Sequence, residues 1–171
     1  SFFLFSTTLL FGAEYTIETV PNVHLQNAKA YVSNPDAILS PSTEQQINLL
    51  LDSLQTKTSA EIAVVAVNSI GDDDIKQFAT ALFEHWGIGK REKDNGLLIL
   101  FVLDQRKITF ETGYGLEGIL PDAICKRIQT RYMLPEFKTG NYDKGMLQGL
   151  NAIHHRLSTP EAQDELWVQS Q

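Results

Sequence analysis

Most residues of this chain whose types and spacing could do chemistry lie in two short segments, Asp94–Gly96 and Gly113–Asp122. The second segment contains the string GYGLEG, which fits the G-x-G-x-x-G pattern of dinucleotide-binding loops. Such a loop should follow the first strand of a βαβ unit and open a helix within the motif. Here the loop follows the third expected strand and the next helix begins only near Pro121. We therefore expect no dinucleotide cofactor.

The same two segments are rich in oxygen ligands. The candidate metal ligands are Asp94, Asn95, Glu117 and Asp122. Carboxylate and amide oxygens without His or Cys suit Ca²⁺ or Mg²⁺ better than Zn²⁺, so the expected cofactor is a divalent cation, Ca or Mg. The alternative is that Asp94-Asn95-Gly96 is only a turn and that Asp122 only caps a helix. Taken singly, each residue fits that alternative; their convergence on one edge of the expected sheet favours a site.

The spacing of apolar residues predicts the elements that must position these ligands. Two almost continuous apolar runs, Glu61–Asn68 and Gly96–Leu103, are typical of strands buried on both faces. A tight turn at Asp104–Arg106 leads into a third strand, Lys107–Gly113, as the second arm of a hairpin. Helical spacing predicts helices that begin at Pro41, after Asp74, near Pro121 and near Tyr142, the third stopping at Pro135 and the last near Leu157.

The order of these elements predicts an α/β fold. Two buried strands joined by a helix imply a parallel βαβ unit with a right-handed crossover, and both faces of such a sheet must be covered. We therefore expect a three-layer α/β/α sandwich with a small mixed β-sheet. Because the third strand runs antiparallel to the second, Gly113 should lie beside Asp94–Gly96. The start of the first strand, at Glu61, should lie on the same edge.

By composition the chain divides into four segments. Residues 1–13 are an uncharged apolar run of signal-peptide length that is too short to span a bilayer. Residues 14–30 are interpreted as an N-terminal arm or linker, residues 31–158 as the domain, and residues 159–171 as a polar C-terminal tail. The first segment predicts export to a periplasmic or membrane-associated location. The alternatives are an uncleaved anchor or a buried strand.

Composition also excludes some classes of function. Hydrophobic residues make up 43% of the chain and charged residues 20%, which is typical of a globular protein. The net charge is −7, and the basic cluster visible in the sequence, Lys90, Arg91 and Lys93, is interpreted as a solvated loop, so no nucleic-acid partner is expected. The single cysteine, Cys125, excludes a disulfide within the chain. It lies in an apolar-periodic stretch and is expected to be buried, not to act as a nucleophile.

A series of short strings resembles a known family, the TPM domain, over roughly residues 31–157. The strings are W-G-I-G at Trp86–Gly89, D-N-G at Asp94–Gly96, G-Y-G-L-E-G-x-L-P-D at Gly113–Asp122 and P-x-F-x-x-G-x-Y at Pro135–Tyr142. The resemblance implies an α/β/α sandwich, export or membrane association, and a site at the edge formed by the second and third strings. Carried over by position, its acids are Asp94, Glu117 and Asp122. One departure is Asn34, which stands where the family usually has an Asp.

Some members of the family are described as acid phosphatases and some bind calcium, which gives two hypotheses. In the first, a divalent ion activates water to hydrolyse a small phosphomonoester, with Asp94, Asp122 and Arg127 as the catalytic residues. In the second, the chain is a non-catalytic metal-binding module that binds an envelope protein partner and assists assembly or repair of a membrane protein complex. The lack of a convincing nucleophile favours the second hypothesis, and the sequence leaves open whether the chain is an enzyme.

Overall fold

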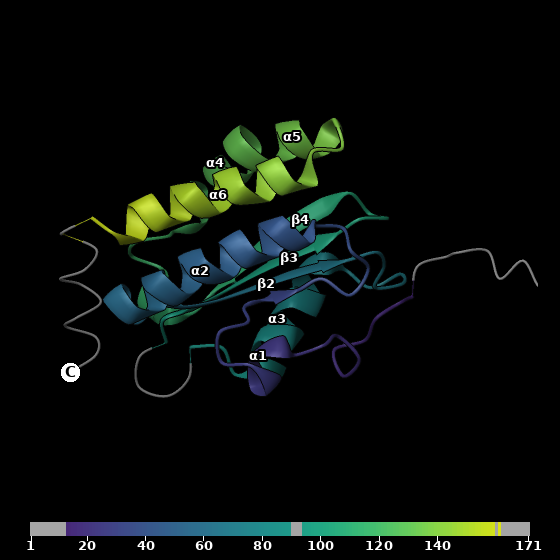
Figure 1. Cartoon of the computed structure of the whole chain (residues 1–171), viewed down its shortest axis with the longest axis horizontal. Helices are drawn as coiled ribbons and strands as arrows, with labels where there is room; N and C mark the ends of the chain where they lie inside the picture. Colours follow the sequence, from purple (N-terminus) through teal and green to yellow (C-terminus); the bar gives the residue numbers. More distant parts are fainter. Residues whose placement is uncertain (1–12, 90–93, 160, 162–171) are drawn as a thin grey trace, which may run out of the picture.

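At the centre of the fold is a four-stranded mixed sheet, seen in a computed structural model that describes residues 13–89, 94–159 and 161 (Figure 1). Its strands lie side by side in the order β1 (Val32–Ser33), β2 (Glu61–Val67), β3 (Gly96–Val102) and β4 (Lys107–Thr112). The first three strands are parallel, and β4 is antiparallel to β3. The two buried strands and the hairpin predicted from the sequence are therefore confirmed.

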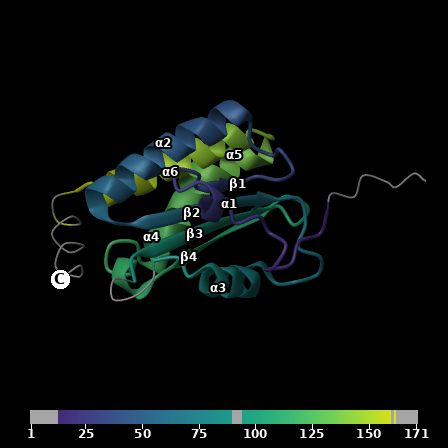
Figure 2. The ribbon, with the colours of Figure 1, turned by 60° about the horizontal axis from the view of Figure 1, so that its bottom comes forward.

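Helices cover both faces of this sheet, which makes the predicted three-layer α/β/α sandwich (Figure 2). One face carries α2 (Pro41–Thr58), α4 (Asp122–Ile128), α5 (Leu134–Lys138) and α6 (Tyr142–Leu157), and the other carries α3 (Ile75–Trp86). Successive strand residues point to opposite faces. In β3, Ile99 thus joins the core beneath α2 and α6, whereas Leu100 joins the core beneath α3. Two separate cores explain why β3 is apolar at every position.

Two of the helices, α2 and α3, begin at residues whose side chains cap their terminal backbone groups. The Ser40 hydroxyl accepts a hydrogen bond from the Thr43 backbone N–H at 3.2 Å, which caps α2. The Asp74 carboxylate accepts from the Gln77 N–H at 3.0 Å and caps α3 in the same way. Gly87 ends α3 in the left-handed conformation, with φ of 62°.

The register of the strands determines which loops meet. Glu61 pairs with Gly96 across β2 and β3, and Leu97 pairs with Thr112 across β3 and β4. The ladder extends one residue further, because the Gly113 N–H donates to the Gly96 carbonyl at 2.8 Å. The start of β2, the start of β3 and the end of β4 therefore share one edge of the sheet, as the expected topology required.

Two elements near the N-terminus are absent from the prediction. A one-turn helix, α1 (Val23–Gln26), lies within the expected arm, and β1 is too short to show a hydrophobic period. The arm packs on the domain: Val20 is buried in the core beneath α3, and the Tyr15 hydroxyl donates to Asp36 Oδ1 at 3.0 Å. The predicted apolar segment, the basic cluster at 90–93 and the tail lie outside the described residues, apart from Ala13, Thr159 and Glu161.

The prediction that the third helix stops at Pro135 is wrong. After α4 the chain makes a π-helical turn, η2 (Gln129–Met133), and continues into α5. In a regular α-helix the Pro135 ring would meet the carbonyl of Arg131, four residues earlier. The wider turn accommodates the proline, and the Leu134 N–H donates across it to Gln129. The helix is therefore distorted before Pro135 and remains helical beyond it.

No helix in the described ranges combines the length and the apolar character needed to cross a bilayer.

Candidate functional site

Backbone contacts join the two segments predicted to form the site, Asp94–Gly96 (the DNG turn) and Gly113–Asp122 (the glycine loop). The Gly115 N–H donates to the Asp94 carbonyl at 2.8 Å. A Cβ added at Gly113 would collide with the same carbonyl oxygen. A glycine is needed here because only backbone fits between the two segments. Gly113 therefore serves the close approach of the two backbone segments.

The segment that follows α3 reaches the same edge and is held by Glu61. The Glu61 Oε2 atom accepts a hydrogen bond from the Gly89 N–H at 2.8 Å. Gly89 has φ of +66°, and a Cβ there would collide with the backbone nitrogen of Gly96. The Glu61 N–H in turn donates to the Asn95 carbonyl at 3.0 Å. Glu61, expected on this edge from the topology, thus holds Gly89 beside the start of β3.

Asn95 is the buried member of the predicted ligand set, with 3% of its surface exposed. Its side-chain nitrogen donates to the Ser59 carbonyl at 2.8 Å and to the Ser59 hydroxyl at 2.9 Å. Ser59 ends α2 in the left-handed conformation, with φ of 66°. The Asn95 amide therefore fixes the turn between α2 and β2, and this role sets the orientation of its side chain.

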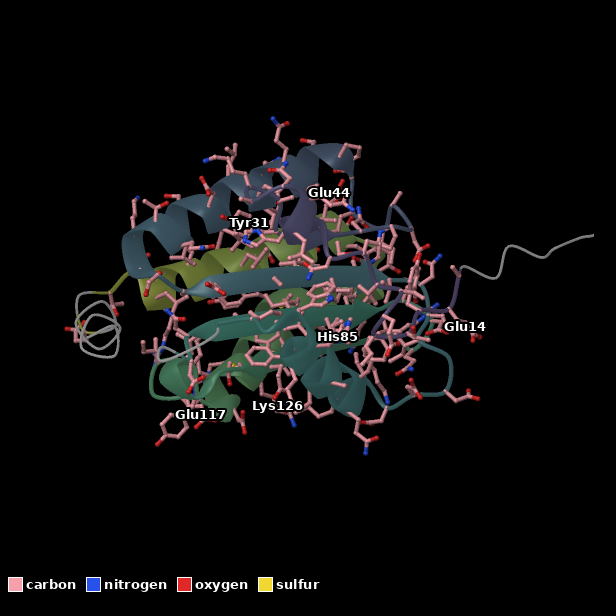
Figure 3. All side chains as sticks on the ribbon, turned by 90° about the horizontal axis from the view of Figure 1, so that it is seen from below. Glu14, Tyr31, Glu44, His85, Glu117 and Lys126 are labelled. Carbon is pink, nitrogen blue, oxygen red and sulfur yellow. The ribbon has the colours of Figure 1, made fainter. Side chains whose placement is uncertain are left out.

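The three acids of the predicted site, Asp94, Glu117 and Asp122, are all exposed. Figure 3 shows Glu117 at the periphery of the fold. Among the residues that the structure describes, no group of three or more His, Cys, Asp or Glu side chains is placed to hold a metal ion. As placed, the acids do not form a ligand set that fits a divalent cation. The cation stays a prediction for this edge.

Arg127 lies on a different side of α4 from Asp122. Five residues of α-helix turn the side chain by about 140° and advance it by about 7.5 Å. Arg127 lines a groove between α4 and α6, where the residues that sequence reasoning missed, Arg131 and Arg156, also lie. The spacing of Arg127 and Arg131, four residues apart, could have indicated a shared helix face. The pairing of that face with α6 has no signature in the sequence.

Cys125 is buried as expected, and its thiol is not suited to act as a nucleophile. Its Sγ lies 3.4 Å from the Leu120 carbonyl, to which the thiol donates. Burial, and then the negative charge of Asp122, raise the pKa of the Cys125 thiol to about 11. The thiol is therefore protonated at neutral pH, and the thiolate is the form that attacks.

A large exposed aromatic side chain on this edge is Tyr114, in the 3₁₀ turn of the glycine loop. It is 80% exposed, whereas its neighbours Gly115 and Leu116 are buried. The loop that carries it is a 3₁₀ turn, Tyr114–Leu116, closed by the Leu116 N–H donating to the Gly113 carbonyl at 3.0 Å. A fixed loop thus presents an aromatic ring to solvent between exposed acids.

Comparison with known proteins gives one family match and several structural relatives. The family model described as the TPM domain matches residues 32–156. A search of curated proteins found no match. The solution structure of the N-terminal domain of a protein from P. gingivalis is 41% identical, covers 85% of this chain and 92% of its own, and has a TM-score of 0.80.

Two more distant structures share the fold. The BA42 protein from the psychrophilic bacterium Bizionia argentinensis is 20% identical, with a TM-score of 0.63 over 72% of this chain and 83% of its own. The N-terminal domain of a protein from Corynebacterium glutamicum is 14% identical, with a TM-score of 0.59 over 85% of this chain and 91% of its own. At these identities the likeness is one of fold alone.

Proposed function

The chain belongs to the TPM domain family, and on that premise we propose that it is an exported, non-catalytic interaction module that binds an envelope protein through the edge formed by the DNG turn and the glycine loop. The observation that carries this proposal is Tyr114, which is 80% exposed on a loop held by backbone hydrogen bonds. An exposed aromatic on a rigid loop supplies contact area at little cost in entropy, and tyrosines are enriched among residues that dominate binding energy.

The charges around Tyr114 indicate the kind of partner. Asp94, Glu117 and Asp122 are exposed on the same two segments, and the Lys76 ammonium is already paired with Glu111 at 2.8 Å. A partner surface with Lys or Arg around an apolar recess would complement an exposed tyrosine and the exposed acids that the structure describes on the same two segments. Such charges on the rim mainly speed association, whereas the ring carries the affinity.

Hydrolysis of a phosphomonoester is the rival function, and the family resemblance is its support. Two features of the described residues weigh against it. The Cys125 thiol is buried, and Arg127 lies on a different side of α4 from Asp122. Catalysis needs groups that converge on one reacting atom. The interaction module requires no such convergence, so it fits the arrangement better.

A divalent cation, Ca²⁺ or Mg²⁺, is a separate proposal for the same edge. Its support is the oxygen chemistry of Asp94, Glu117 and Asp122, whose side chains would have to move together to bind the ion. No step of the interaction role depends on it. The test is thermal unfolding of the whole chain with and without calcium chloride, in the wild type and in the Asp94→Asn/Asp122→Asn variant. A rise in Tm that the variant lacks would support the cation; equal curves in the wild type would overturn it.

The first test of the proposed function is an assay with p-nitrophenyl phosphate across the acidic and neutral pH range, with and without a chelator. The module predicts no release of nitrophenol above the rate without protein. Release that the Asp94→Asn/Asp122→Asn variant abolishes would overturn the proposal in favour of a phosphatase. Release that survives both substitutions would also contradict a non-catalytic module, and it would exclude these acids as the catalytic groups.

The second test is site-specific crosslinking in cells that make the protein. A photo-reactive amino acid replaces Tyr114 in one variant and Leu49 in a control, because Leu49 is also exposed, at 67%, but lies on α2. The module predicts a discrete crosslinked envelope protein from position 114 only. Excess wild-type domain should compete for it, and a Tyr114→Ala domain should not. Equal products from both positions would contradict a binding role for the edge.

A further inference from the structure

A second feature of the surface is a groove of about 510 Å³ between the α4–η2 helix and α6, which we call the basic groove. Its polar walls are Arg127, Arg131 and Tyr132 on one side and Gln148, His155 and Arg156 on the other. None of its lining residues belongs to the DNG turn or the glycine loop. It is therefore a separate surface from the edge that carries Tyr114.

The charge of the basic groove is opposite to that of the molecule. The chain has a net charge of −7, yet among the described residues that line the groove there are three arginines and no acid. Within the described ranges, Arg127, Arg131 and Arg156 form no ion pair. Like charges held close together without counterions repel one another, so an anion that neutralises them would be favoured.

One arginine is held in place by a hydrogen bond, and a second lies against a neighbouring aromatic ring. The Arg156 Nε donates to the Ile119 carbonyl at 2.7 Å, which fixes the guanidinium between α6 and the end of the glycine loop. The Arg131 guanidinium carbon lies 5.9 Å from the centre of the Tyr132 ring, a cation–π distance. Donors that are already ordered lose less entropy when they bind a ligand.

The backbone that carries two of the groove residues is a π-helical turn. Arg131 and Tyr132 both lie within the π-helical turn η2, and such turns are rare and frequent at functional sites. The turn packs closely on α6 because the Met133 side chain fills the space that a Cβ on Gly149 would need. Gly149 thus allows the Met133 side chain of the π-helical turn to lie against the α6 backbone.

From these features we propose that the basic groove binds a small organic dianion, with its oxyanion held by the arginines and an apolar or aromatic body against Ile124, Ile128 and Tyr132. Guanidinium groups bind carboxylate and phosphate oxygens in a bidentate way, and several together match a doubly charged group. A volume of about 510 Å³ falls within the size range of small-molecule sites. The apolar residues select a ligand larger than a free inorganic ion.

The test is titration of the whole chain with phenyl phosphate and with isophthalate at physiological salt, followed by calorimetry and by amide chemical shifts. Phenol and inorganic phosphate are the ligand controls, because each lacks one half of the proposed chemistry. The protein variants are Arg127→Gln and Arg131→Gln, neither of which removes a described backbone contact. Lys126→Gln is the matched control: Lys126 is exposed on the same helix, at the periphery in Figure 3, and does not line the groove.

The expected result is that at least one of the two aromatic dianions binds, and binds more tightly than either control ligand. Each arginine substitution should raise the Kd about tenfold, as loss of one charge-assisted contact predicts, while Lys126→Gln changes it less than about threefold. Amide shifts should centre on Arg131, Tyr132 and Gln148. Failure of both dianions to bind, equal weakening by Lys126→Gln, binding of inorganic phosphate as tight as that of the dianions, or shifts centred on the glycine loop would each overturn the proposal.

Discussion

The backbone N–H of Gly115 donates to the carbonyl oxygen of Asp94 across 2.8 Å, and this hydrogen bond fixes the glycine loop on the DNG turn. Asp94 precedes β3 and Gly115 follows β4, so the two residues lie at the two ends of the β3–β4 hairpin. The bond is possible because Gly113, between the ladder and the loop, has no side chain to hold the backbones apart. The backbone N–H groups on either side of Tyr114, those of Gly113 and Gly115, donate to Gly96 and Asp94. The Tyr114 side chain is therefore left in solvent.

Gly113→Ala should therefore lower the free energy of unfolding by about 1–3 kcal/mol, the usual cost of adding a methyl group where none fits. The added Cβ would meet the Asp94 carbonyl, a backbone atom that cannot swing away as a side chain can. Urea unfolding followed by circular dichroism measures the change. Gly118→Ala, at an exposed position of the same loop, is the control and should change stability by less than about 0.5 kcal/mol. Equal losses in the two variants would contradict the close approach.

Cys125 should be unreactive in the folded protein. Burial raises the pKa of its thiol to about 11, so only about one thiol in a thousand is ionised at pH 8. A disulfide exchange reagent should modify it at the rate of global unfolding and at once in guanidinium chloride. Rapid modification without denaturant would show an accessible thiolate and would make Cys125 a candidate nucleophile.

Tyr31 should make stability depend on pH in the alkaline range. Burial, then the hydrogen bond from its hydroxyl to Asp52 Oδ1 at 2.9 Å and the charge of Asp52, raise the Tyr31 pKa from 10.0 to about 12. A raised pKa means that the unfolded chain loses this proton first. The stabilisation is present in full below pH 10 and is lost as the pH rises through 12.

The measurement is the free energy of unfolding from pH 8 to 12 in the wild type and in Tyr31→Phe. The difference in the free energy of unfolding between the wild type and Tyr31→Phe should shrink as the pH rises from 10 to about 12. Tyr114→Phe is the control, because its ring is 80% exposed and the substitution should leave the curve parallel to that of the wild type. A difference between wild type and Tyr31→Phe that is constant with pH would be inconsistent with a shifted group.

The sheet edge could be predicted because its evidence is local. The run Gly96–Val102 is apolar at every position, which only a strand covered on both faces explains, and the turn before Lys107 makes β4 its hairpin partner. Because β4 runs antiparallel to β3, these two facts predict that Gly113, after the end of β4, lies beside Gly96 at the start of β3. β1 could not be predicted because a strand of two residues shows no hydrophobic period. The continuation of the helix beyond Pro135 could not be predicted from the sequence. A proline indicates the end of an α-helix, and the sequence does not show that the preceding turn is π-helical.

The side-chain roles at the edge were less predictable, because they depend on partners distant in the sequence. Asn95 was expected as a metal ligand, yet its amide nitrogen donates to Ser59, whose left-handed conformation at the end of α2 is not visible in the sequence. Arg127 was expected with Asp122, yet the packing of α4 on α6 places it with Arg131 and Arg156. Residue types alone predict polar chemistry, but the three-dimensional pairing of helices decides which residues line the same groove.

Asn95→Asp separates the two roles of that residue. If its amide is a structural donor, a carboxylate in its place puts negative charge against the Ser59 carbonyl and leaves a buried acceptor unpaired, so the free energy of unfolding should fall by at least about 2 kcal/mol. If it is a cation ligand, the added charge should instead strengthen calcium binding. Thermal unfolding with and without calcium chloride decides: a low Tm that calcium does not restore supports the structural role, and full restoration contradicts it. Asn27→Asp is the matched control, because its Oδ1 only accepts from the Lys29 N–H at 3.0 Å, which a carboxylate can also do.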